Sequence, residues 1–154
     1  MNRKIFGIAV FLLFVVFLSG CGVENGIVPP ETAELNISID PNPVPYSAED
    51  EEWQYAMTIS ESNGVGVTIS SLRFDLYDSQ EEELIFTETE IYYEEDITDW
   101  FGTNYIPAFS SIQDPTFYTW EEEFSGNYDI VTVSGTDDNG NPVEATARID
   151  YLPQ

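Results

Sequence analysis

Val143-Glu144-Ala145-Thr146-Ala147-Arg148-Ile149-Asp150-Tyr151 alternates strictly between apolar and polar side chains. A period of two is typical of a β-strand with one buried face, because successive side chains of a strand point to opposite faces of the sheet. The residues before it, Asp137-Asp138-Asn139-Gly140, are those that tight turns favour. We therefore predict a hairpin whose second arm turns its apolar side chains inward and its polar side chains outward.

Segments upstream of this hairpin carry similar apolar patterns and predict further strands. They are residues 35–39, 53–60, 67–76, 84–93, 117–120 and 126–134. In the third of them Val67 and Ile69 occupy one parity, whereas Leu72 and the apolar residues after it occupy the other. One extra residue is needed to bring both sets to the same face, so we predict a β-bulge near Ser70-Ser71.

The fold class follows from these strands together. About seven short strands, turns rich in glycine and asparagine, and no convincing helical period favour an all-β, antiparallel β-sandwich. Residues 94–116 have the weakest pattern, and we expect loops there with one short edge strand. The three tryptophans and many tyrosines and phenylalanines supply enough apolar surface for a core, which argues against a disordered chain.

The last hairpin also carries a family resemblance. Ser125-Gly126-Asn127-Tyr128, the strand after it and Thr136-Asp137-Asp138-Asn139-Gly140-Asn141-Pro142 resemble the closing hairpin of bacterial immunoglobulin-like surface domains. The resemblance implies an immunoglobulin-like sandwich, with Tyr128 where such domains often place a corner tyrosine. Simple alternation from Tyr128 points Val131 and Val133 outward, so we expect a bulge near Ile130. The inter-sheet cysteines of antibody domains are absent.

The first 21 residues form a separate pattern. Arg3 and Lys4 precede an apolar run over residues 5–18, which is typical of a helical signal segment. As a helix this run spans roughly 21 Å, short of the ~30 Å hydrocarbon core of a membrane. Leu18-Ser19-Gly20-Cys21 resembles a bacterial lipoprotein lipobox. This resemblance implies cleavage before Cys21, attachment of diacylglyceryl and palmitate-type acyl chains to Cys21, and anchoring in the cell envelope.

These patterns predict three parts of the chain. Residues 1–20 are the cleaved lipoprotein signal peptide, residues 21–33 are the lipidated cysteine and a flexible tether, and residues 34–154 are the sandwich domain. The domain is expected to face outside the cytoplasm. If the host is Gram-negative, Gly22 after the cysteine favours the outer membrane by the same resemblance.

The charge of the chain is extreme. Loss of residues 1–20 removes Arg3 and Lys4 but no acid, so two arginines and 29 carboxylates leave a side-chain charge of −27. Nucleic acid is excluded as a partner, since phosphate neutralisation needs Lys and Arg. Mutual repulsion favours a monomeric domain at low salt, and an acidic surface of this kind suits a saline surrounding.

The residue types limit the chemistry. Without histidine, and with its one cysteine expected to carry lipid, the chain has neither the base nor the nucleophile of common acyl-transfer sites, and we predict that it is not an enzyme. No cofactor is required. Calcium is the alternative, because it takes six to eight oxygen ligands. The candidate ligands are Asp137, Asp138 and Asn139 in the hairpin turn, and Glu94, Asp96 and Asp99. Turn geometry alone also explains the first set.

A cluster of aromatic residues falls in the weakly patterned region. Trp100, Phe101, Tyr105 and Phe109 either form an exposed face for a glycan or protein partner, or close the open end of the sandwich. We expect a lipid-anchored envelope protein with a non-catalytic binding or structural domain. The alternatives are a calcium-stabilised adhesion or recognition module and a passive acidic envelope component adapted to high salt.

Overall fold

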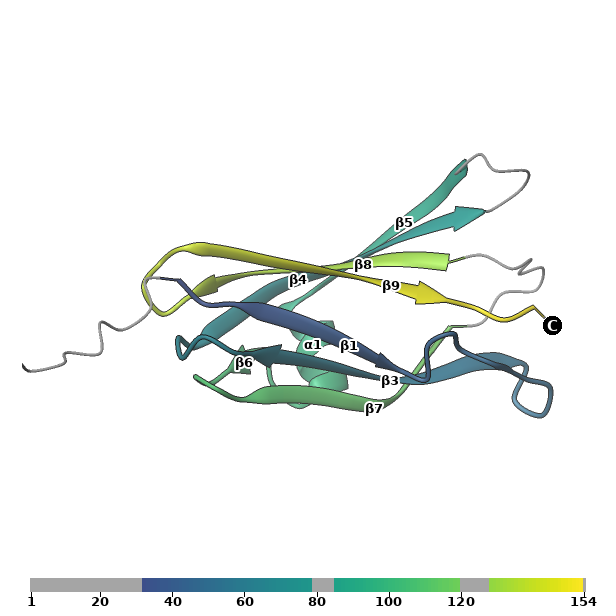
Figure 1. Ribbon diagram of the computed structural model, residues 1–154, viewed down its shortest axis with the longest axis horizontal. Helices are drawn as coiled ribbons and strands as arrows, with labels where there is room; N and C mark the ends of the chain where they lie inside the picture. Colours follow the sequence, from purple (N-terminus) through teal and green to yellow (C-terminus); the bar gives the residue numbers. More distant parts are fainter. Residues whose placement is uncertain (1–31, 79–84, 120–127, 154) are drawn as a thin grey trace, which may run out of the picture.

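The computed structural model describes residues 32–78, 85–119 and 128–153. In these ranges two antiparallel sheets pack face to face (Figure 1). The first sheet contains β1 (Leu35–Asp40), β2 (Tyr46–Ser47), β3 (Glu52–Glu61) and β7 (Ser111–Thr119). The second contains β4 (Val67–Asp78), β5 (Ile85–Tyr93), β6 (Tyr105–Ile106), β8 (Tyr128–Asp137) and β9 (Pro142–Asp150). The expected signal segment and Cys21 lie outside the described residues.

The strand order is that of an immunoglobulin-like sandwich. β3 is central to the first sheet, between β1 and β7, and the second sheet runs β5-β4-β8-β9. The chain therefore changes sheet between β3 and β4, between β5 and β7, and again between β7 and β8. This is the arrangement of strands A, B, E and C′, C, F, G in immunoglobulin-like domains. Seven of the described strands have six or more residues, so the predicted antiparallel sandwich is confirmed.

The core lies between the inner faces of the two sheets. In β3 every second residue is buried, as the alternation predicts, and Trp53, Met57 and Ile59 have no exposed surface. They face Leu72 of β4 and the buried valines of β8 in one continuous cluster. Each such side chain contributes about 1.5–3 kcal/mol through burial. The Trp53 Nε1–H donates to the carbonyl of Leu152, so the one polar group of this ring is satisfied.

The predicted bulge in β4 is confirmed. The register between β4 and β8 shifts between Ile69 and Ser71, so both apolar sets of β4 reach the core. Gly135 is the partner of Ile69 at this point. A side chain on Gly135 would collide with the backbone oxygen of Thr68, so the two strands come together here only because residue 135 has no Cβ.

The second expected bulge, near Ile130, is wrong. β8 pairs with both neighbours without a shift from Tyr128 to Ser134. Asp129, and not Tyr128, takes the inward position, so plain alternation already buries Val131 and Val133. Tyr128 is still 95 % covered, because its ring stacks on Tyr77 and lies under the Arg148 guanidinium on the outer face of the sheet.

Residues 94–101 form a helix that the apolar pattern did not predict. α1 (Glu94–Phe101) has three acids in its first turn and ends at Gly102, whose φ of 75° is the left-handed conformation of a helix C-cap. Ile97 and Phe101 are its buried residues. The expected short strand is present as β6, and β7 then begins at Ser111, earlier than predicted. None of the helices among the described residues is long and apolar enough to cross a membrane.

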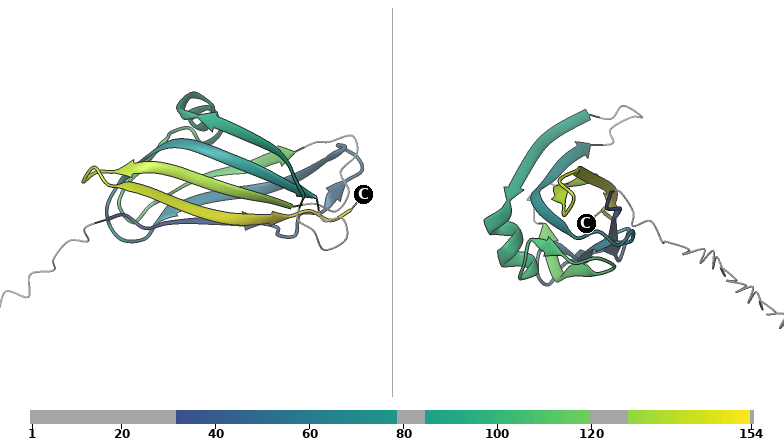
Figure 2. Two further views of the ribbon diagram at one scale, coloured as in Figure 1. Left: turned by 90° about the horizontal axis from the view of Figure 1, so that it is seen from above. Right: turned by 90° about the vertical axis from the view of Figure 1, so that its left-hand side faces the viewer.

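The strands run along the length of the domain and give it two distinct ends. We call one the Ala33 end, where the chain enters the sandwich and where the turns after β3 and β8 lie, and the other the Leu152 end (Figure 1). The end-on view in Figure 2 shows β5 at the edge of its sheet, next to β4, with α1 below β5 at the side of the sandwich. The 49–51 connection between β2 and β3 lies at the Leu152 end.

Candidate functional site

The Ala33 end is organised around a buried carboxylate, Glu61, the last residue of β3. Its side chain accepts hydrogen bonds from four backbone N–H groups and only 3 % of the residue is exposed. The Oε1 atom receives Asn63 at 2.7 Å and Glu34 at 3.3 Å. The Oε2 atom receives Gly64 at 2.8 Å and Phe109 at 2.9 Å. One side chain thereby holds the incoming chain, the turn after β3 and the turn before β7 together.

The pKa of Glu61 reports the balance of two opposing effects. Burial alone raises the pKa of a carboxyl, because the low-dielectric interior disfavours the charge. Here the hydrogen bonds from Phe109, Asn63, Gly64 and Glu34 stabilise the ionised form more strongly, and the pKa lies below its ordinary value. Glu61 is therefore a structural anion, held ionised by backbone donors. Sequence reasoning missed it, although its position before Ser62-Asn63-Gly64 suits a carboxylate that caps a turn.

Asp137 performs the same task in the hairpin turn. Its Oδ1 accepts the N–H groups of Asn139 and Asn141, and its Oδ2 accepts the N–H of Ala33 and the Asn141 side-chain amide. Burial opposes its ionisation, but these donors hold the pKa of Asp137 below its usual value. Asp138 points elsewhere and accepts the Tyr105 hydroxyl at 3.1 Å. The hydrogen bonds of the tight turn therefore account for the position of Asp137 without a metal ion.

The second set of candidate calcium ligands lies on α1. Glu94 and Asp96 are in its first turn, where Asp96 accepts the backbone N–H of Tyr93, and Asp99 is exposed one turn later. Asp96 therefore acts as a capping side chain, and acids in a first turn also suit the helix dipole. Within the described ranges, no three Asp, Glu, Cys or His side chains come close enough to hold a metal ion. Calcium binding stays a prediction, and the positions of Glu94, Asp96 and Asp99 add no support to it.

The four aromatic residues of the weakly patterned region separate into two pairs. Trp100 packs edge-on against Tyr92 and Phe117, with ring centroids 4.6 and 5.0 Å apart, and Phe101 is buried. This pair covers the side of the sandwich between β5 and β7. Tyr105 and Phe109 remain exposed at 39 % and 75 %. The structure therefore does not bring the four candidate binding residues into one face.

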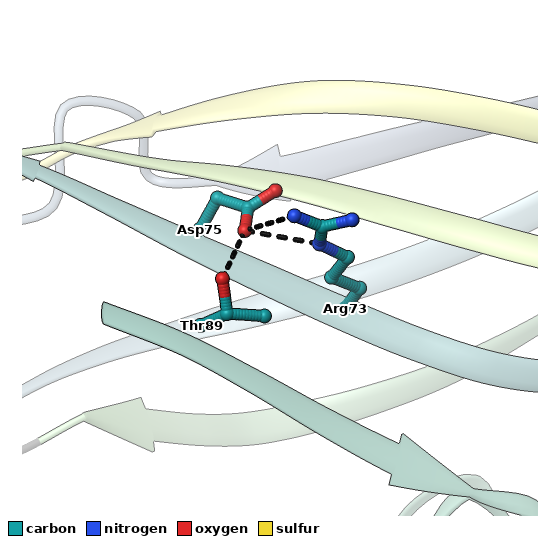
Figure 3. A network of polar contacts seen from close by, with 3 residues as sticks. All are labelled: Arg73, Asp75 and Thr89. Atoms are coloured by element: carbon teal, nitrogen blue, oxygen red, sulfur yellow. Dashed lines mark hydrogen bonds and ion pairs between the residues drawn. The ribbon is translucent and has the colours of Figure 1, made fainter. Parts of the chain in front are cut away.

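The outer face of the sheet that contains β5, β4, β8 and β9 carries an ion pair on β4. Arg73 donates from Nε and Nη2 to Asp75 Oδ1, at 3.0 and 2.8 Å, and Thr89 of β5 donates to the same oxygen at 2.6 Å (Figure 3). Asp75 is 8 % exposed, whereas half of the Arg73 side chain is accessible. Beside this network Ile91 and Tyr93 of β5 are 46 % and 61 % exposed.

A second ion pair lies at the opposite edge of the same face, on β9. Arg148 of β9 forms an ion pair with Asp150 at 2.6 Å, and its guanidinium carbon lies 3.6 Å from the centre of the Tyr128 ring. The outer face, which we define as the outward side chains of β5, β4, β8 and β9, thus carries Arg73 and Arg148, which are all the basic residues left after residue 20. From residue 34 onward the chain has 27 carboxylates and these two arginines, a side-chain charge of −25, so this face holds the domain's positive side chains.

Tyr151, Asp129 and Tyr55 form a polar network inside the core. The Tyr151 hydroxyl donates to Asp129 Oδ2 at 2.7 Å, and Tyr55 is hydrogen-bonded to Tyr151. Burial raises the pKa of both tyrosines, and the nearby Asp129 charge raises it further. All three side chains are less than a tenth exposed. The network joins β3, β8 and the end of the chain after β9, and it offers no access to a ligand.

Comparisons with known proteins give no family for this chain. No family model matches it, and no curated protein matches its sequence. Among solved structures it is similar to the CARDB domain of the PF1109 protein from Pyrococcus furiosus, solved in complex with di-metal ions. That match has 13 % identity, covers 78 % of this chain and 89 % of that one, and has a TM-score of 0.43.

A second solved structure gives a weaker likeness. Spo0M, a sporulation control protein from Bacillus subtilis, matches with 13 % identity, covers 79 % of this chain and 50 % of its own, and has a TM-score of 0.39. Scores and identities this low carry neither the metal ions of the first protein nor the sporulation role of the second over to this chain. The assignment to an immunoglobulin-like sandwich rests on the strand order described above.

Proposed function

We propose that this protein is a lipid-anchored component of a bacterial cell envelope whose sandwich acts by contact and not by catalysis. The observation that carries the proposal is the way the chain enters the domain. Ala33 and Glu34 donate their N–H groups to Asp137 and Glu61, and the Asn63 side chain donates to the carbonyl of Thr32. The segment that follows the expected lipidated Cys21 is thereby fastened to turns that are distant in sequence, as a load-carrying attachment requires.

The hydrogen bonding of the buried carboxylates supports a non-catalytic role. The buried carboxylates of the described chain, Glu61, Asp75, Asp129 and Asp137, each accept hydrogen bonds from structural donors. A general acid donates a proton to the substrate and a general base accepts one from it, at near-neutral pH. Acids held in this way stabilise the fold instead. The chain also has no histidine to serve as a base.

The contact surface in this proposal is the outer face of the sheet that contains β5, β4, β8 and β9. It combines two arginines, exposed Ile91 and Tyr93, and the hydroxyl of Thr89, which suits a protein or glycan partner. Arginine and tyrosine are the residue types that contribute most at binding surfaces.

The anchor is tested on the full chain expressed in a bacterium. We expect metabolic labelling with a palmitate analogue to mark the unaltered protein and to leave Cys21→Ser unlabelled, since serine lacks the thiol. The matched control is Gly22→Ala, which changes the adjacent residue and keeps the thiol. Label on Cys21→Ser equal to that on the unaltered protein would reject lipidation at Cys21, and with it the anchoring part of the proposal.

The contact surface is tested by photo-crosslinking in intact envelopes. A crosslinking amino acid replaces Ile91 on the outer face in one variant and Tyr118 on β7 in the other; the two native side chains are 46 % and 56 % exposed and belong to opposite sheets. We expect a discrete adduct from position 91 that is missing from position 118. Equal adduct patterns from the two positions would mean that the outer face is not a specific contact surface.

A further inference from the structure

The turn between β6 and β7 exposes an unusual run of apolar residues. Pro107, Ala108 and Phe109 are all exposed, and the Ser110 N–H donates to the Pro107 carbonyl at 3.1 Å to close the turn. Phe109 has a φ of 54°, in the left-handed region where glycine or asparagine is usual in such turns. A bulky residue kept in this conformation, with 75 % of its surface in water, invites a functional explanation.

The turn is held rigidly at the Ala33 end. The Phe109 N–H donates to Glu61 Oε2, and the other oxygen of the same carboxylate accepts the N–H of Glu34, where the chain enters. The ring lies over Gly64, so closely that a Cβ there would come within 2.5 Å of it. The exposed aromatic residue and the incoming chain are therefore neighbours, fixed through one side chain.

Tyr105, two residues before this turn, adds a second exposed aromatic ring. Its hydroxyl donates to Asp138, and the hydroxyl end of the side chain lies against Gly66, so its position is fixed by the turns on either side. A tyrosine with an apolar ring and a bound hydroxyl suits the boundary between water and lipid. Residues 105 and 107–109 thus form one small apolar surface at the Ala33 end, which we call the apolar tip.

The length of the chain before the domain sets how far this end can be from the anchor. Twelve residues, 22–33, separate Cys21 from Glu34. Fully extended they reach at most about 40 Å, and a flexible chain of this length has a root-mean-square span of about 20 Å. If Cys21 carries lipid, the Ala33 end is held within about 40 Å of the membrane surface.

Exposed acids lie at both ends of the domain. At the Ala33 end Glu61 and Asp137 are buried and hydrogen-bonded, but Glu34 and Asp138 are exposed, and at the Leu152 end Glu49, Asp50 and Glu51 are exposed. Charge therefore does not select which end approaches a membrane, and the apolar tip has to supply that selection.

We propose that the apolar tip of Tyr105 and residues 107–109 rests in the headgroup layer of the membrane to which Cys21 is attached, and so orients the sandwich with its strands pointing outward. This inference depends on the proposed lipid anchor. Lipidation alone leaves the domain free to tumble on its tether. The tip supplies a second, weak contact that selects one orientation.

The test uses the full, lipidated chain reconstituted into phosphatidylcholine vesicles. Because Cys21 is acylated in that form, a cysteine introduced by Phe109→Cys is the only free thiol and takes an environment-sensitive fluorophore. The control is Leu152→Cys, a residue 44 % exposed at the opposite end. We expect lipids that carry a nitroxide near the headgroup to quench the label at position 109 several-fold more than the label at position 152.

A second pair guards against a disturbed turn. Tyr105→Cys and Tyr118→Cys place the same label on the tip and on β7, and we expect the same ranking of quenching. Equal quenching within both pairs, on protein that floats with the vesicles, would overturn the apolar-tip proposal and leave the anchor intact. Protein that does not float with the vesicles would overturn the lipid anchor itself, and the proposal with it.

Discussion

Replacing Glu61 with glutamine should destabilise the domain far more than the loss of one charge would. Glutamine keeps one acceptor oxygen but places an NH₂ group where the other oxygen receives two backbone N–H groups. Two buried donors then lose an acceptor, and hydrogen bonds to a charged group contribute about 1.5–3 kcal/mol each. We expect Glu61→Gln to lower the free energy of unfolding by about 3 kcal/mol, or the melting temperature by about 10 °C.

The assay is urea unfolding of protein that begins at residue 31, followed by tryptophan fluorescence. Glu34→Gln is the matched control, because the Glu34 side chain is exposed at the Ala33 end and this substitution removes the same charge as Glu61→Gln. In a domain this acidic, losing a surface carboxylate should be neutral or slightly stabilising. Equal stabilities of the two variants would refute the view that Glu61 holds the Ala33 end together.

The pH dependence gives an independent check. The pKa of Glu61 is lower in the folded than in the unfolded protein, so its contribution is complete above the ordinary value of 4.5 and is lost as the pH falls through the lowered folded value. The stability gap between the unaltered protein and Glu61→Gln should therefore narrow in acid. A gap that stays constant from neutral pH down to pH values well below 4.5 would contradict this linkage.

Three further predictions concern other parts of the fold. Tyr151→Phe removes the donor to Asp129 and should lower the free energy of unfolding by about 1–3 kcal/mol; a variant as stable as the unaltered protein would contradict this. Because burial raises the pKa of Tyr151 in the folded state, the unaltered protein should lose stability as the pH rises above 10. Gly135→Ala should cost at least about 1 kcal/mol by driving β8 from Thr68, whereas Ser134→Ala should be nearly neutral. Calcium should raise the melting temperature no more than sodium at equal ionic strength, because the Asp137 oxygens already accept four donors; an excess due to calcium would revive a metal site.

Patterns of period two were enough to predict the sandwich. The strand from Val143 onward, the alternation of β3 and the bulge near Ser70 follow from which residues must share a buried face. The bulge expected near Ile130 was wrong because the inference assumed that Tyr128 points inward. A tyrosine can be covered equally well on an outer face when an arginine and a second tyrosine lie beside it.

Helix α1 escaped prediction because eight residues are too few to establish a period of 3.6. Its start and stop signals were nevertheless present, in the acids of the first turn and in Gly102 after Phe101. The site was harder still. Nothing local in the sequence distinguishes Glu61 from 28 other carboxylates, because its role depends on donors from Glu34 and Phe109, which only the folded chain brings to it.

The attachment at Ala33 has a mechanical consequence. The chain enters at one end of the sandwich, and Leu152 lies at the other, so tension between an anchor and a load at the far end acts parallel to the strands (Figure 1). Such tension would load the six residue pairs between β1 and β3 together, in shear, instead of opening them one after another. Before β1 can slide, the bonds of Ala33 and Glu34 to Asp137 and Glu61 must break. The domain is therefore built to resist being pulled from the surface by its leading segment.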